Sequence, residues 1–357
     1  MLGPVGSRGD ATQAGLPRSP LEVVPPLRTR AGTAAAEDAE IAAMGGAELV
    51  AGIERLRRDR HAVVLAHNYQ VAEIQDLADV VGDSLELARQ AAAASADVIV
   101  VCGVHFMAET AALLNPGRRV LVPDPEAGCS LAASVTAEDV RRWRGAHPGA
   151  VAVAYVNTSA AVKAEVDVCC TSANAVEVVR SVPTGTEILF LPDRHLAAFV
   201  ERHTGRRLEA WPGECHVHAA IGLDDVDAKA AEHPGAHLLL HPECGCVRDV
   251  LSRLADEARD GTPTFVLSTG GMARHARECE HDVELVATEV GMLHRLGKEN
   301  RRTRFVPVRD DAVCSYMKTG TLATLYRALR DDVHEVQIPE PIAGRARATI
   351  ERMLAVA

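Results

Sequence analysis

Aromatic residues and runs of basic residues are scarce in this sequence. Phe, Trp and Tyr make up 3% of its 357 residues, and the formal net charge is −11. Single-stranded nucleic acid binds on aromatic stacking surfaces, and nucleic acids in general bind on basic surfaces. The composition therefore argues against a nucleic-acid-binding protein. It is compatible with an anionic small-molecule substrate, because a pocket can be locally positive.

Long apolar runs and a secretory leader are also missing. No run reaches the roughly 18–20 residues of a membrane helix, and the N-terminus has no basic start followed by an apolar core. Nine cysteines are too few, in a chain of this length, for a disulfide scaffold. Their odd number without a leader predicts a cytoplasmic protein whose cysteines are free, metal-bound or catalytic.

Residues 1–45 are rich in Pro, Gly, Ala and Arg without periodicity, which predicts a disordered tail. We expect three α/β domains after it, at residues 46–145, 146–232 and 233–357, the last with C-terminal helices. In each domain short apolar strands alternate with helical segments, as in parallel sheets. The predicted strands are 61–66, 97–102 and 119–123 in the first domain, 150–156, 166–170 and 187–191 in the second, and 237–240, 264–267 and 304–308 in the third.

The expected fold class is α/β, with three similar αβα domains and short parallel sheets. In open parallel sheets, ligands bind beyond the carboxyl ends of the strands. Three such domains facing one another, with pseudo-threefold symmetry, would gather their strand-end loops around one central active site.

Three cysteines occupy similar places in the three domains. Cys129, Cys215 and Cys314 each follow the third predicted strand of a domain, in a loop with Gly, Glu or Asp nearby. Three thiolates on one axis would suit a metal centre; alternatively, each is a small core residue. A [4Fe–4S] cluster held by three thiolates leaves one iron without a protein ligand, and that iron can act as a Lewis acid.

The other cysteines have simpler interpretations. Those that end apolar strands are expected in the core: Cys102, Cys169 and Cys170. Cys279 lies in a polar helix and is expected to have no role. Cys244 and Cys246 lie on a strand-end loop, so a core position and a ligand role both stay open.

A series of segments carries a family resemblance from about residue 46 to residue 330. In order, they are AHNYQ, DLAD, GDSLELA, CGVHFMAETA, LLNP, PDPEAGCSLA, YVNTSAAVKAEVD, TSANAV, PDRHL, WPGECHVH, HPEC, STGGM, TEVGMLHRL and CSYMK-x-x-TL. The series strongly resembles the quinolinate synthase A family. Because so many segments match in order, the resemblance is far more specific than any one of them.

The resemblance implies condensation of iminoaspartate with dihydroxyacetone phosphate to give quinolinate, phosphate and water, in de novo NAD biosynthesis. It implies one oxygen-sensitive [4Fe–4S] cluster per chain, with Cys129, Cys215 and Cys314 as ligands. It also implies a functional link to L-aspartate oxidase, and neither a nucleic-acid nor a membrane partner.

Roles for pocket residues follow from the same resemblance. Glu243 is the expected general acid–base, with His241 and Tyr69 as further catalytic residues. Besides these catalytic residues, the residues expected to contact substrate are His67, Tyr155, Asn157 and His216. His218 is expected to be structural. In each case the alternative is an ordinary loop or core side chain.

Four hydroxyl residues, Ser84, Ser172, Ser268 and Thr269, lie at predicted helix starts. Residues there are ordinarily N-caps, and Asp83 is the expected cap of the first of these helices. A helix N-terminus also attracts phosphate and carboxylate groups. We therefore expect both roles, with the hydroxyl residues binding the anionic substrates.

Three alternative functions stay open. A different three-cysteine cluster enzyme could dehydrate a hydroxy acid. A nucleotide-binding regulatory module is a second alternative, although the sequence has neither a G-x-G-x-x-G after a strand nor a G-x-x-x-x-G-K-[ST]. A zinc protein is the third, although there is no C-x-x-C pair.

Overall fold

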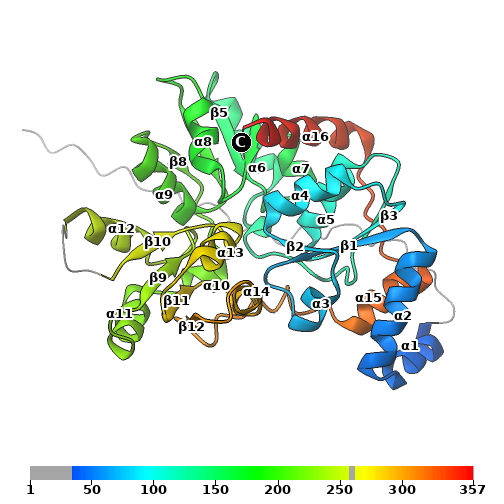
Figure 1. Cartoon of the computed structure of the whole chain (residues 1–357). Helices are drawn as coiled ribbons and strands as arrows, with labels where there is room; N and C mark the ends of the chain where they lie inside the picture. The colour runs from blue at the N-terminus through cyan, green and yellow to red at the C-terminus, as the bar shows by residue number, and fades with distance from the viewer. Residues whose placement is uncertain (1–33, 257–261, 357) are drawn as a thin grey trace, which may run out of the picture.

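The computed structural model describes residues 34–256 and 262–356. It contains three four-stranded sheets, and every strand pair in them is parallel (Figure 1). Helices flank each sheet. The predicted fold class of three αβα units is therefore confirmed.

All three sheets share one strand order. The first strand of each unit lies between the second and the third, and the fourth forms an edge next to the third. The strands are β1 Ala62–His67, β2 Val80–Gly82, β3 Val98–Cys102 and β4 Arg119–Leu121 in the first unit, β5 Val151–Tyr155, β6 Val168–Cys170, β7 Ile188–Leu191 and β8 Glu209–Ala210 in the second, and β9 His237–Leu240, β10 Thr264–Val266, β11 Val283–Ala287 and β12 Arg304–Pro307 in the third.

Each unit therefore has one strand more than the sequence predicted. The strands missed are β2, β8 and β11. β2 and β8 are three and two residues long, too short for an apolar run to stand out. In β11 a charged residue, Glu284, interrupts the apolar run.

The helices α1 to α16 connect and cover these sheets. They are α1 Ala34–Ala43, α2 Gly46–Asp59, α3 Ala72–Leu77, α4 Ser84–Ala93, α5 His105–Leu114, α6 Ala137–Ala146, α7 Ala160–Lys163, α8 Ala175–Ser181, α9 Arg194–Thr204, α10 His216–Ala219, α11 Leu223–Glu232, α12 Val247–Asp256, α13 Thr269–Glu278, α14 Met292–Glu299, α15 Leu322–Asp331 and α16 Glu340–Ala355. Within residues 34–256 and 262–356, no helix combines the length and apolar character needed to cross a membrane.

The first sheet shows why these strands are so apolar. Val98 and Val100 of β3 lie in one apolar cluster with α2 and α15, whereas Ile99 and Val101 lie in another with α4 and α5. Both faces of the strand are thus covered, as parallel sheets require. Cys102 at the end of β3 is buried in the core, and so are Cys169 and Cys170 in β6 of the second sheet, as expected.

The ordered chain begins earlier than predicted. α1 runs over Ala34–Ala43, and its Ile41 is buried in the same apolar cluster as Leu325 and Leu329 of α15. The prediction of a disordered tail up to residue 45 is therefore wrong over this helix. The rest of the predicted tail, residues 1–33, lies outside the described residues.

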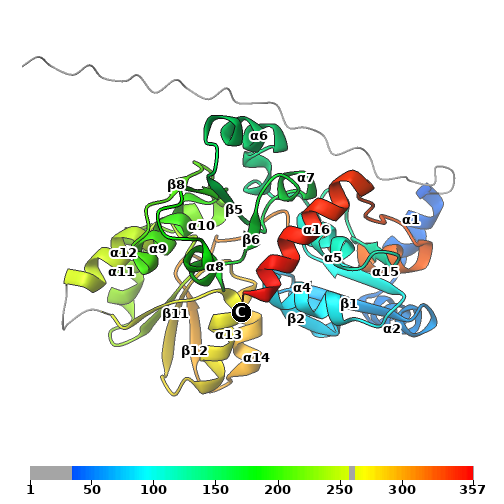
Figure 2. The ribbon, with the colours of Figure 1, turned by 90° about the horizontal axis from the view of Figure 1, so that it is seen from above.

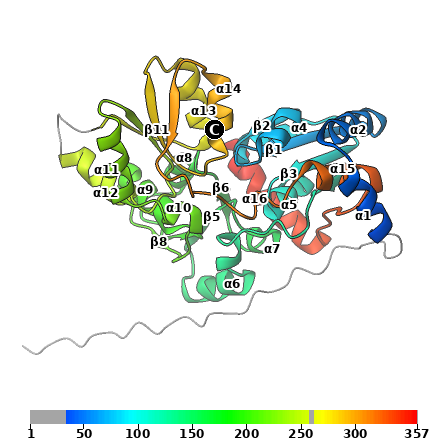
Figure 3. The ribbon, with the colours of Figure 1, turned by 90° about the horizontal axis from the view of Figure 1, so that it is seen from below.

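The last two helices return to the first two units. α15 packs against α2 beside α1 (Figure 3). α16 packs against α5 of the first unit and against α7 and β6 of the second (Figure 2). The sequence analysis had assigned α15 and α16 to the third domain, but these helices pack on the first and second units. The domain boundaries themselves stay a prediction.

We predict that Leu325→Ala destabilises the protein by about 2–5 kcal/mol, because it leaves a cavity where α15 packs on the first unit. Urea denaturation followed by circular dichroism measures this. Leu322→Ala, on the partly buried part of the same helix, is the matched control. Equal midpoints for the two variants would contradict the observed packing.

Candidate active site

Strand-end loops from all three units meet in one cavity of about 720 Å³, its open mouth included. The carboxyl ends of parallel strands lie at the same edge of a sheet, and the three sheets turn these edges toward one another. Of the fourteen predicted site residues, all except Ser268 line the cavity. They are His67, Tyr69, Ser84, Cys129, Tyr155, Asn157, Ser172, Cys215, His216, His241, Glu243, Thr269 and Cys314.

Equivalent strands contribute equivalent groups to the cavity. The first strands and the loops after them carry His67, the last residue of β1, with Tyr69, then Asn157, and then His241 with Glu243. The loops after the second strands carry Ser84, Ser172 and Thr269, and those after the fourth strands carry the three cysteines. The sequence analysis placed the cysteines after third strands. That was wrong, because it had missed one strand in each unit.

The three cysteines are free thiols that line the same cavity. Burial raises the pKa of the Cys129 thiol, and the nearby Cys215 and Cys314 add to this effect. The described part of the chain contains three groups of His, Cys or Glu side chains whose ligand atoms all lie within 4.8 Å of one another. The sulfurs of Cys129, Cys215 and Cys314 do not form such a group, so at least two of them lie farther apart than that. Thiolates on a single tetrahedral zinc ion lie only about 3.8 Å apart. The spacing therefore fits a larger metal group better than one ion.

Glu243 lies at the centre of a buried polar group. Tyr155 donates a hydrogen bond to its Oε1, and His218 Nδ1 lies 3.3 Å from its Oε2. Burial alone would raise the pKa of this carboxyl, but His218 overrides it, and with His241 and Tyr155 it lowers the pKa to about 2. Glu243 is thus an ionised carboxylate, which can accept a proton.

The other buried histidines near Glu243 are neutral. Burial lowers the pKa of His241 to about 3 and that of His67 to about 4. The His241 ring stacks on His218, with 4.6 Å between centroids and 21° between planes. Neutral imidazoles can both donate and accept hydrogen bonds, so the two rings can orient a polar substrate.

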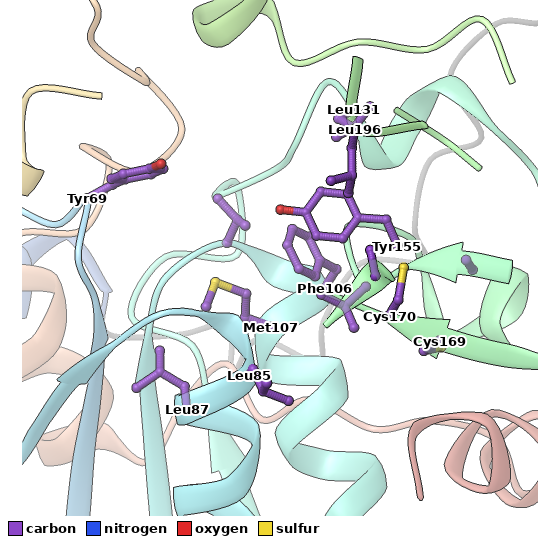
Figure 4. Packing of buried hydrophobic residues seen from close by; sticks show 14 of the residues in the cluster. Tyr69, Leu85, Leu87, Phe106, Met107, Leu131, Tyr155, Cys169, Cys170 and Leu196 are labelled. Carbon is purple, nitrogen blue, oxygen red and sulfur yellow. The ribbon is translucent and has the colours of Figure 1, made fainter. Parts of the chain in front are cut away.

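Tyr69 and Tyr155 face the cavity from the first and second units, with their hydroxyl groups directed toward each other (Figure 4). The Tyr69 hydroxyl lies 2.6 Å from Thr288 Oγ1 and 3.2 Å from His218 Nε2. Burial, and then the charge of Glu243, raise the pKa of both phenols well above their ordinary value. Both are therefore neutral hydrogen-bond donors.

His218 is the residue that the sequence analysis misjudged. It was expected to be structural, yet it lines the cavity and contacts Glu243, Tyr69 and His241. His216 lies at the same cavity, where its Nδ1 lies 2.7 Å from the hydroxyl of Ser130, another lining residue. His216 and His218 are two residues apart on the short α10, so their rings point to different sides of it. Only the tertiary structure shows that His218 is the one that reaches Glu243.

Glu289 and Lys318 are two further residues that sequence reasoning missed. The buried Glu289 carboxylate accepts from the backbone N–H of Cys314 over 3.1 Å, and Lys318 Nζ lies 3.0 Å from its Oε1. Lys318 also donates to the carbonyl of Tyr69. This network joins the third cysteine to a catalytic candidate. Both residues lie in segments already noted, TEVGM and CSYMK.

Asp83 explains why Ser268 does not reach the cavity. Its Oδ1 accepts from Leu85 N–H and Glu86 N–H and so caps α4, as predicted. Its Oδ2 accepts from the Ser268 hydroxyl over 3.1 Å and from Gly270 N–H over 3.2 Å. One carboxylate thus joins the N-termini of two helices from different units at the cavity wall.

A fully buried lysine holds the loop that carries Asn157. Lys163 donates to the carbonyls of Val156, over 2.8 Å, and of Thr158, on either side of Asn157. Its ammonium also lies 5.4 Å from the centroid of the Phe106 ring. Lys163 is therefore a positioning residue for the second unit's opening loop.

Acid–base groups, hydroxyl donors and three thiols share one buried cavity between three parallel α/β units. These features define an enzyme whose thiols can hold a metal, rather than a binding module.

The comparisons with known proteins agree. A family model described as "Quinolinate synthetase A protein" matches residues 51–355. A protein named quinolinate synthase from Thermus thermophilus is 54% identical over 313 residues, which cover 88% of this chain and 99% of the relative. Relatives of the same name come from Mycobacterium tuberculosis (50% identical; 87% and 90% covered) and Pyrobaculum aerophilum (47% identical; 84% and 96% covered). The chain belongs to the quinolinate synthase family.

We predict that Lys163→Met lowers stability by about 1–3 kcal/mol for each carbonyl left without a donor and raises KM, because the Asn157 loop loses its anchor. Thermal denaturation and initial rates measure the two effects. Lys229→Met, which removes a surface ion pair with Glu232, is the control. Unchanged KM and melting temperature in the Lys163 variant would contradict this role.

Proposed function

We propose that the protein is a quinolinate synthase, which condenses iminoaspartate with dihydroxyacetone phosphate to give quinolinate, phosphate and water in de novo NAD biosynthesis. One observation carries this proposal most directly. Three cysteines from three units and the Glu243 group open into one cavity. Family membership supports the same reaction.

The proposed cofactor is one [4Fe–4S] cluster per chain, held by Cys129, Cys215 and Cys314. The donors fit such a cluster, because they are free thiols around one cavity and their sulfurs are spaced more widely than the ligands of a single ion. When bound, the cluster would supply an open iron that acts as a Lewis acid toward a substrate oxygen.

The protein groups then have complementary tasks. The Glu243 carboxylate is the proposed proton acceptor, while Tyr155 holds it in place and can return a proton. His241 and Tyr69 are the further proposed catalytic groups. The neutral imidazole of His67, and His216, are proposed to orient the substrates.

Anion binding is proposed at the helix starts around the cavity. Both substrates are anions. Asp83 already accepts from backbone N–H groups at the N-termini of α4 and α13, so the side-chain hydroxyl groups there are the proposed donors to the substrates. Ser84 and Thr269 lie at these starts, with Ser172 and Asn157 opposite them in the second unit. Ser268 acts instead through Asp83.

The alternatives are less well supported. The spacing of the three sulfurs disfavours a single zinc ion held by all three cysteines, although the ligand atoms of Cys215, His218 and Glu243 lie within 4.8 Å of one another. A regulatory module does not account for an ionised carboxylate buried among two tyrosines and three histidines. A hydro-lyase acting on a hydroxy acid would use the same cavity, so the test must detect pyridine formation itself.

Iminoaspartate must come from an enzyme that oxidises aspartate, so we propose L-aspartate oxidase as the functional partner. A reducing cytoplasm is the proposed location, because all nine cysteines are free thiols.

The experiment that tests the function is an anaerobic assay of iron and sulfide combined with quinolinate formation from the two substrates. We expect four irons and four sulfides per chain and a product with pyridine absorbance. A cluster without pyridine formation would contradict the proposed reaction.

Changing Cys129, Cys215 or Cys314 to Ala is predicted to abolish the cluster, because each supplies one of its three protein ligands. Iron content and visible absorbance measure the loss. Cys102→Ala, at a buried strand end outside the cavity, should keep both. A full cluster spectrum in all three ligand variants would refute the assignment.

Glu243→Gln is predicted to keep the cluster but lower turnover by roughly 10²–10⁴-fold, because an amide cannot accept the proton. Anaerobic single-turnover rates measure this, and the visible spectrum reports the cluster. Glu138→Gln, on the exposed face of α6, is the control. A near-normal rate would remove Glu243 from the proposed mechanism.

A further inference from the structure

A second group of metal-ligating side chains lies in the third unit, away from the cavity. It consists of His237 at the start of β9, Glu284 in β11, and His275 and Cys279 at the end of α13. Cys279 Sγ lies 3.0 Å from Glu284 Oε1, His275 Nε2 lies 3.2 Å from it, and His237 Nδ1 lies 3.6 Å from it. None of these residues lines the cavity.

The fold brings the four side chains together by regular geometry. Glu284 and His237 are directly paired in the register of β11 and β9. His275 and Cys279 are four residues apart, so they share one face of the last turn of α13. The Phe265 ring packs 4.4 Å from the His275 ring and 5.8 Å from the His237 ring, between centroids, and partly shields the group from water.

The carboxylate of Glu284 is buried with one oxygen unpaired. Its side chain is 0% exposed, and its Oε2 is buried without a hydrogen-bond partner. His237 Nδ1 is also buried without a partner. A buried carboxylate with an unpaired oxygen is costly unless a cation or donor compensates it.

We propose that His237, His275, Cys279 and Glu284 form a binding site for a divalent zinc-like ion. Two imidazole nitrogens, one thiolate and one carboxylate oxygen form a donor set that zinc accepts in tetrahedral geometry. In such a site the ligand atoms lie about 3.3–3.8 Å apart. The ligand atoms of His275, Cys279 and Glu284 all lie within 4.8 Å of one another. His237 Nδ1, which lies 3.6 Å from Glu284 Oε1, is the proposed fourth ligand.

Two neighbouring donors orient the sulfur of Cys279. The His281 backbone N–H donates to Cys279 Sγ over 3.4 Å, and the Thr303 hydroxyl donates to it over 3.7 Å. Such donors around a ligand sulfur orient it toward the metal. Cys279, for which the sequence suggested no role, is therefore a ligand.

The protein fills all four positions, so the ion is structural rather than catalytic. It ties α13 to the amino ends of β9 and β11. Thr288 and Glu289 directly follow β11 and contact the cavity residues Tyr69 and Cys314. At roughly 3.3 Å per residue, Thr288 lies about 13 Å along the strand from Glu284. The site therefore stabilises the third unit without touching the reactants.

The test uses the full chain with its own cluster intact, purified without oxygen. The protein is incubated with one equivalent of Zn²⁺, freed of unbound metal and analysed for zinc and iron. We expect one zinc per chain with iron content unchanged, and a melting temperature several degrees higher. The X-ray absorption spectrum at the zinc edge should show one sulfur and three nitrogen or oxygen ligands.

Variants locate the site. Cys279→Ser and His275→Gln should each lose the bound zinc and the rise in melting temperature while keeping iron and circular dichroism. The control is His294→Gln, which removes a different His–carboxylate pair, that with Asp76. It should keep both the bound zinc and the rise in melting temperature. Absence of bound zinc in the wild type would overturn the proposal. So would a three-sulfur shell, because zinc would then occupy the cavity cysteines, and so would full binding in both site variants.

Discussion

The parallel arrangement of each four-stranded sheet is the constraint on which the site depends. Parallel strands send all their carboxyl ends to one edge, and a single strand order is repeated in three sheets. Each unit therefore contributes a first-strand loop with polar groups, a second-strand loop with a hydroxyl, and a fourth-strand loop with a thiol. α16, which packs on both the first and second units, helps to hold two of these edges together.

Burial determines the chemistry within that arrangement. Glu243 keeps its charge although it is buried, because His218, His241 and Tyr155 compensate it. Asp193 is buried as well, and burial together with the charge of Glu243 raises the pKa of its carboxyl. The pKa values of the two carboxyls are thus shifted in opposite directions, which favours the negative charge on Glu243.

Comparison of prediction with structure shows where sequence patterns are weak. Most of the predicted apolar strands lie within a residue or two of the observed ones, because a buried parallel strand is a continuous apolar run. The short β8 and the interrupted β11 carry no such run and were missed. Because one strand was missed in each unit, the prediction placed the cysteines after the third strand instead of the fourth. The three cysteines do lie at one cavity, as the prediction had grouped them.

The sequence by itself determined the α/β class, the tandem repetition and the grouping of the three cysteines, because strand-end positions follow from continuous apolar runs. The family resemblance supplied most of the other cavity residues. Only the tertiary structure decided which way a side chain points within a loop. It turned His218 toward Glu243, Ser268 toward Asp83, and Cys279 toward Glu284. These contacts join residues from separate elements, and in two cases from separate units, so no local pattern encodes them.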